Sequence, residues 1–69
     1  MRDFLTRFIS AYFRDNQQLR LGQQFVNLYI KEPWPELFYE EDNYKAIEMI
    51  SQWLKDNQYW EKEPPRVNK

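Results

Sequence analysis

Apolar side chains recur every three or four positions in three separate stretches of this 69-residue chain, and this spacing limits the fold more than any other feature. A repeat of about 3.6 residues places such side chains on one face of an α-helix, with polar side chains opposite. The pattern predicts helices over residues 2–14, 19–31 and 43–57. Three short helices of this kind pack into a compact all-α bundle, which is the fold class that we expect.

The connection between the second and third predicted helices contains two prolines, in the sequence EPWPELFYEED (32–42). Pro33 and Pro35 lack a backbone donor and favour extended geometry in the residues before them, so they end the second helix. Pro35 also suits the first position of a helix, and the Glu36 carboxylate is favourable near a helix N-terminus. We therefore expect one helical turn over 35–39.

Gly22 is the only glycine of the chain, and it lies within the second predicted helix. Glycine in a helix interior costs about 1 kcal/mol relative to alanine, so its presence needs a reason. Two interpretations are equally open at this stage. Either another part of the backbone passes close to Gly22, or this residue marks a late start of the helix.

Polar residues indicate where the last helix begins and where the domain ends. Asp42 or Asn43 is a suitable N-cap for the third helix. After that helix, the sequence EKEPPRVNK (61–69) has the proline and charge content of a disordered tail. We therefore predict a single helical domain over 1–60, followed by a flexible tail.

Composition excludes several large classes of function. The chain contains no cysteine and no histidine, so the usual catalytic triads, thiolate metal sites and histidine metal sites are absent. Its length also excludes a large two-domain enzyme. Because no motif for phosphate or calcium binding is present either, we predict a protein that is not an enzyme, with no catalytic residue, no metal site and no cofactor.

The location expected from the sequence is the cytoplasm. Crossing a bilayer takes roughly 20 apolar residues, and no uncharged apolar run approaches that length. The first ten residues, MRDFLTRFIS, carry charges where a signal peptide would be apolar. We therefore expect an intracellular protein with no membrane partner.

Aromatic residues are the most informative feature for function. The chain has three tryptophans, five tyrosines and five phenylalanines, more than the faces of three short helices can cover. Within the proline connection, we expect Trp34, Leu37 and Phe38 to fold back onto the core and Tyr39 to face outward with nearby carboxylates. Exposed aromatic residues are typical of protein-binding surfaces and of self-association, so a homodimer is also open. The predicted protein-binding residues are Trp34, Glu36, Tyr39, Glu40, Glu41 and Tyr44.

DNA binding is the alternative function. The formal net charge of −1 argues against strong affinity for phosphates, but residues 1–31 carry five basic side chains against two acidic ones. The helix predicted near 20–30 carries amide side chains of the kind that can bind adenine edges in a major groove. The residues that would bind nucleic acid are Arg7, Arg14, Arg20, Gln23, Gln24 and Asn27.

Three short motifs resemble those of small uncharacterised proteins encoded by bacterial phages and prophages. The first motif is formed by Leu19, Arg20, Gly22, Gln23 and Phe25. The second is Leu37, Phe38 and Tyr39, and the third is Trp53 and Leu54. The resemblance spans residues 4–54 and implies a phage-type accessory protein. That class is rich in small inhibitors of host machinery, including anti-CRISPR and other anti-defence proteins. We therefore expect an accessory protein that acts through protein–protein interaction with a host or phage protein.

Overall fold

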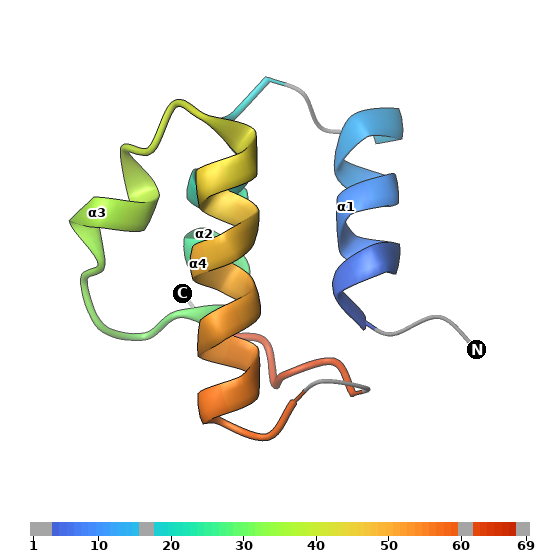
Figure 1. The fold of residues 1–69 in the computed structure, drawn as a ribbon, viewed down its shortest axis with the longest axis vertical. Coiled ribbons are helices and arrows are strands. Elements are labelled where there is room, and N and C mark those ends of the chain that lie inside the picture. The colour runs from blue at the N-terminus through green and yellow to red at the C-terminus, as the bar shows by residue number, and fades with distance from the viewer. Residues whose placement is uncertain (1–3, 16–17, 60–61, 68–69) are drawn as a thin grey trace.

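The computed structural model describes residues 4–15, 18–59 and 62–67 of the chain. These residues contain four helices and no strand, so the predicted all-α class is confirmed. The predicted start of the first helix, at residue 2, falls outside the described residues. The helices are α1 (Phe4–Asp15), α2 (Leu21–Tyr29), α3 (Pro35–Phe38) and α4 (Asn43–Asp56), as shown in Figure 1.

Helix α2 occupies the centre of the fold. It lies beside α4, while α1 and α3 flank this pair on opposite sides (Figure 1). Aromatic rings join these helices edge to face, which sets the positive edge of one ring against the negative face of another. The Phe8 and Phe25 ring centroids are 5.5 Å apart at 82°, and those of Phe25 and Trp53 are 5.6 Å apart at 77°. Phe25 is fully buried and therefore connects α1 to α4 through α2.

The residues that begin α3 and α4 are those that the sequence predicts. The Asp42 side chain accepts a hydrogen bond of 2.9 Å from the Tyr44 backbone amide, so Asp42 is the N-cap of α4. Pro35 is the first residue of α3, and its carbonyl accepts a hydrogen bond of 3.0 Å from the Tyr39 amide. The helical turn expected over 35–39 is therefore present.

Helix α2 is two residues shorter at each end than the predicted span of 19–31. Before its start, the Leu19 carbonyl accepts a hydrogen bond from the Tyr12 hydroxyl of α1, and Arg20 is extended with ψ at 152°. After its end, Ile30 is extended with ψ at 121°, and its side chain is buried. The residues at both ends of α2 thus make contacts with other parts of the molecule. The apolar spacing within α2 gives no information about such contacts, so the sequence pattern predicted a longer helix.

Gly22 is the point where α3 approaches α2. A Cβ atom at this position would lie 2.2 Å from the Leu37 carbonyl oxygen and 2.8 Å from the Leu37 Cδ1 atom, far inside ordinary contact distance. Leu37 is fully buried. Both interpretations of this glycine are therefore correct, because it is the second residue of α2 and the backbone of α3 passes directly against it.

The segment 62–67 departs from the flexible tail predicted over 61–69. Pro64 is fully buried, and the Val67 amide donates a hydrogen bond of 2.9 Å to the Leu28 carbonyl of α2. Proline suits a buried position because its ring is apolar and it has no backbone donor that needs a partner. This segment therefore packs as part of the folded domain, and packing continues beyond residue 60.

We predict that Gly22→Ala destabilises the protein. Alanine alone would favour a helical position by about 1 kcal/mol, but its methyl group would push against the Leu37 backbone. Overpacking of this kind costs about 1–3 kcal/mol, and a clash with backbone lies at the upper end of that range, so the free energy of unfolding in urea should fall by up to about 2 kcal/mol. Gln23→Ala, in the same helical turn, is the control and should change it by about 0.5 kcal/mol or less. A Gly22→Ala protein more stable than the wild type would contradict the close approach.

Candidate functional site

The predicted protein-binding residues run from the N-cap of α3 through α3 and the loop that follows it to the first turn of α4. We call this set the acidic aromatic surface. Both of its tyrosines are strongly exposed, Tyr39 at 65 % of its full accessible surface and Tyr44 at 81 %. Glu36 and Glu41 are also exposed, whereas Trp34 and Glu40 are half-buried. The acidic aromatic surface consists of Trp34, Glu36, Tyr39, Glu40, Glu41 and Tyr44.

The side chains of the proline connection divide between the core and the solvent as predicted. Leu37 is fully buried, and Trp34 and Phe38 are half-buried and packed against the core. The Phe38 and Tyr39 rings meet edge to face, with centroids 4.9 Å apart. Phe38 therefore supports the exposed ring of Tyr39 from the core side.

A cavity of about 330 Å³ opens beside Tyr39. It lies between the end of α2 and the proline connection, and most of the side chains around it are apolar or aromatic. A hollow of this kind can receive one large apolar side chain from a partner, which is how interface anchors bind. The residues that line it are Val26, Asn27, Pro33, Trp34, Pro35, Phe38 and Tyr39.

The carboxylates near this cavity are free to interact with a partner. Among the described residues, the side chains of Glu36, Glu40 and Glu41 make no hydrogen bond or ion pair, whereas Asp42 is engaged as the cap of α4. In the same described part of the chain, no three acidic side chains lie close enough together to hold a metal ion. The chemistry that these carboxylates offer is therefore attraction for basic groups on another molecule.

The three arginines of the alternative nucleic-acid set are exposed but differ in their surroundings. Arg14 Nε lies 3.0 Å from Asp15 Oδ2, so part of its charge is neutralised. Arg7 lines a cavity of about 360 Å³ that also contacts Gln24 and the segment 62–67. Arg20 precedes α2 in extended backbone. Of the six residues, the structure thus brings Arg7 and Gln24 to the same cavity.

Helix α2 is poorly placed to act as a DNA recognition helix. A recognition helix needs a free face that can enter the major groove. On α2, Asn27 is exposed, but Gln23 and Gln24 are half-buried because α1, α3 and α4 surround this helix. The amide side chains that suggested base recognition therefore lie on the central helix of the fold.

A second surface, which the sequence analysis did not predict, forms where the segment 62–67 meets α2. The Tyr29 hydroxyl donates a hydrogen bond of 2.8 Å to Glu63 Oε2, and Arg66 Nε donates to the same oxygen at 3.0 Å. The Arg66 guanidinium also lies over the Tyr29 ring, 5.9 Å from its centroid, within range of a cation–π interaction. These contacts fix Glu63 and Arg66 on either side of the two prolines.

The Tyr29–Glu63–Arg66 cluster alters the acidity of its members. Burial, together with the hydrogen bond to Glu63 and the negative charge of that group, raises the pKa of Tyr29 from 10.0 to about 12. Hydrogen bonds from Tyr29 and Arg66 lower the pKa of Glu63. The cluster is therefore most stable with the phenol protonated and the carboxylate ionised.

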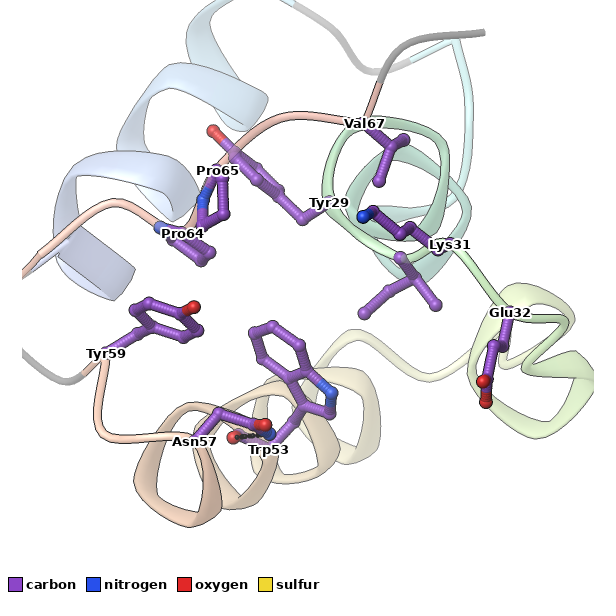
Figure 2. A pocket seen from close by; sticks show the side chains of 10 residues that line it. Tyr29, Lys31, Glu32, Trp53, Asn57, Tyr59, Pro64, Pro65 and Val67 are labelled. Atoms are coloured by element: carbon purple, nitrogen blue, oxygen red, sulfur yellow. Dashed lines mark hydrogen bonds between the residues drawn. The ribbon is translucent and has the colours of Figure 1, made fainter.

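Aromatic rings and prolines surround a cavity of about 340 Å³ next to this cluster. Figure 2 shows Trp53 and Tyr59 on one side of it, with Pro64 and Pro65 from the C-terminal segment on the other. The Trp53 and Tyr59 rings are stacked, with centroids 5.8 Å apart at 22°. Lys31 lies along the wall, also labelled in Figure 2.

The composition of residues 61–69 gave no indication of this second surface. The segment EKEPPRVNK contains few apolar residues, which is typical of disorder, and the sequence does not reveal that Pro64 has an aromatic surface to cover. Tyr59 could have indicated this surface. It is an aromatic residue shortly before the two prolines, and it belongs to none of the apolar faces of the three predicted helices. Aromatic residues near a proline pair can form a groove for it.

No family model, curated protein or solved structure matches this chain. Within the described residues, none of the helices has the length and apolar character that a membrane crossing requires.

We predict that the stability of the protein falls between pH 10 and 12 through Tyr29. Its pKa is higher in the folded protein than in the unfolded chain, so this contribution is complete below pH 10 and is lost as pH rises through about 12. The rise from 10.0 to about 12 corresponds to at most about 3 kcal/mol, and solvent screening of this partly exposed cluster reduces the contribution to on the order of 2 kcal/mol.

The measurement is urea unfolding at several pH values between 9 and 12. Tyr29→Phe should lose less stability over this range than the wild type, because its ring cannot ionise. Tyr44→Phe, at a strongly exposed tyrosine, should behave as the wild type does. Equal pH dependence in the wild type and Tyr29→Phe would show that the phenol is not held protonated.

Proposed function

We propose that this protein is a small, non-enzymatic, intracellular protein that acts by binding another protein through the acidic aromatic surface. The observation that carries the proposal is the exposure of Tyr39 and Tyr44, at 65 % and 81 %, beside a cavity of about 330 Å³. Tyrosines that are exposed in the free protein and adjoin a hollow are suited to become buried anchors in a complex.

Charge indicates the chemistry of the partner. Residues 32–48 contain six acidic side chains and one basic side chain, Lys45, although the whole chain has a net charge of only −1. Such a local excess accelerates association with a positively charged surface and disfavours an acidic one. We therefore propose a partner that presents lysines or arginines around an apolar side chain, with that side chain entering the cavity beside Tyr39.

The resemblance to phage and prophage proteins supports a host or phage protein as the partner, and inhibition as the outcome. A domain of this size inhibits most simply by covering a surface that its target needs. The basic surface of a nucleic-acid-binding protein would suit the acidic aromatic surface, because the same groups that hold phosphates also attract carboxylates.

The experiment is affinity capture from a bacterial lysate, followed by titration of the purified partner. Replacing both Tyr39 and Tyr44 by alanine should weaken binding by at least tenfold, since aromatic anchors contribute about 2 kcal/mol or more in typical interfaces. The fold should persist, because both side chains are largely exposed. Helical circular dichroism and the urea midpoint would confirm this.

Two control variants distinguish a specific effect at the acidic aromatic surface from the effect of removing any exposed ring or carboxylate. Phe13→Ala removes a partly exposed ring from α1, at 44 % exposure, and should leave binding unchanged. Glu36→Gln with Glu41→Gln should slow association, whereas Glu48→Gln on the exposed side of α4 should do so less.

Three results would contradict the proposal. One is unchanged partner affinity in the folded tyrosine double variant. A second is a complex that disappears when the lysate is treated with nuclease, which would favour the alternative of nucleic-acid binding. A third is self-association through these tyrosines as the only interaction, detected by light scattering.

A further inference from the structure

The segment 62–67 binds the rest of the molecule as an extended proline-rich peptide would. Proline fixes its own φ near −65°, and each residue before a proline is forced towards extended geometry. Glu63 and Pro64 each precede a proline and are therefore held extended by covalent structure, and the φ of Pro65 is fixed by its ring. Such a segment loses little conformational entropy when it binds, which is why proline-rich peptides are common ligands of aromatic grooves.

The surface that receives this segment has the composition of a proline-binding groove. Tyr29 from the end of α2, Trp53 from α4 and Tyr59 after α4 converge on the two prolines (Figure 2). We call these three side chains the aromatic groove. Tyr29 is buried, whereas Trp53 and Tyr59 are half-buried, so part of the aromatic surface stays accessible beside the prolines.

Polar contacts give the interaction a direction along the segment. Glu63, before the prolines, accepts from the Tyr29 hydroxyl, and Arg66, after them, lies over the Tyr29 ring. The Val67 amide then pairs with the Leu28 carbonyl. Together, these contacts recognise a peptide in which an acidic residue, two prolines and an arginine follow one another in that order.

We infer that the aromatic groove is a recognition site for Pro-Pro-Arg segments of other proteins, which the chain's own residues 63–67 occupy in this structure. The site is distinct from the acidic aromatic surface and does not rest on the function proposed for it. The occupant is a proline-rich peptide with a carboxylate before the prolines and an arginine after them, because the bound segment itself has that chemistry.

The internal segment is built to be exchangeable. Its ion pair joins Glu63 to Arg66 within the segment and is open to water, with these side chains 46 % and 64 % exposed, so the pair contributes little to holding the segment on the groove. The charged residues are held on the groove by the Tyr29 hydrogen bond to Glu63 and by the position of Arg66 over the Tyr29 ring. The internal segment is favoured over an external peptide because it is part of the same chain, and a tethered ligand has an effective concentration in the millimolar range. An external peptide therefore binds weakly until the internal contacts are loosened, because only the open fraction of molecules accepts it.

The test uses the full chain with Glu63→Ala and Arg66→Ala, which loosen the internal segment and leave the groove intact. Fluorescence anisotropy measures binding of the labelled peptide KEPPRV, the sequence of residues 62–67. The double variant should bind this peptide at least tenfold more tightly than the wild type, a difference of about 1.4 kcal/mol. Tyr59→Ala added to the double variant should abolish the gain.

A matched control protein carries Lys45→Ala and Glu48→Ala, which also removes one basic and one acidic exposed side chain but lies on α4 outside the groove. It should bind KEPPRV as weakly as the wild type. The control peptide KEAARV should bind none of the proteins. Circular dichroism checks the fold, and if the double variant is unfolded, Arg66→Ala alone, which keeps the Tyr29 hydrogen bond to Glu63, replaces it with the same expected direction.

Equal peptide affinity in the wild type and the folded double variant would overturn the inference, because the segment would then be a fixed part of the core. Binding of KEAARV as tight as that of KEPPRV would also overturn it. Concentration-dependent dimerisation of the wild type that KEPPRV reverses would support the groove and identify a second copy as a donor of the segment.

Discussion

The contact between Leu37 and Gly22 is the constraint on which the arrangement of the proposed binding surface depends. Because Gly22 has no Cβ atom, the backbone of α3 reaches the surface of α2, and Leu37 enters the core. Pro33 and Pro35 restrict the chain that leads into α3, so the connection has few alternative paths. With Leu37 fixed inward, the turn directs Tyr39 outward. The exposed aromatic ring is thus a consequence of one close backbone approach at a glycine.

The small size of the domain explains why aromatic residues serve both as core and as surface. A chain of this length buries only about 60 % of the surface that it exposes when unfolded, so every buried ring contributes substantially. Phe8 meets both Phe25 and Tyr29 edge to face, and the Phe25 and Tyr29 rings pack against each other in a tilted arrangement. The C-terminal prolines extend this core by covering the aromatic groove. Rings that none of these contacts cover, chiefly Tyr39 and Tyr44, remain available for a partner.

The sequence was sufficient where local chemistry decides the structure. Apolar spacing located the three longer helices, Asp42 was one of two cap candidates, and Leu37 and Tyr39 were expected to face the core and the solvent, respectively. The sequence was insufficient where contacts between distant segments decide the local structure. The hydrogen bond from Tyr12 to the Leu19 carbonyl engages the chain just before α2, and no pattern within α2 contains that information. Likewise, the composition of residues 61–69 is that of a disordered segment, and only the shape of the groove explains why Pro64 is buried.

Side-chain accessibility in solution tests the central claim that the proline connection is divided between core and surface. Hydroxyl-radical footprinting with mass spectrometry measures the oxidation rate of individual side chains in the folded protein. We expect rapid oxidation of Tyr39 and Tyr44, slow oxidation of Leu37 and Tyr29, and intermediate rates for Trp34, after correction for the reactivity of each residue type. Protection of Tyr39 and Tyr44 in the monomer, or oxidation of Leu37 at the rate of the unfolded chain, would contradict it.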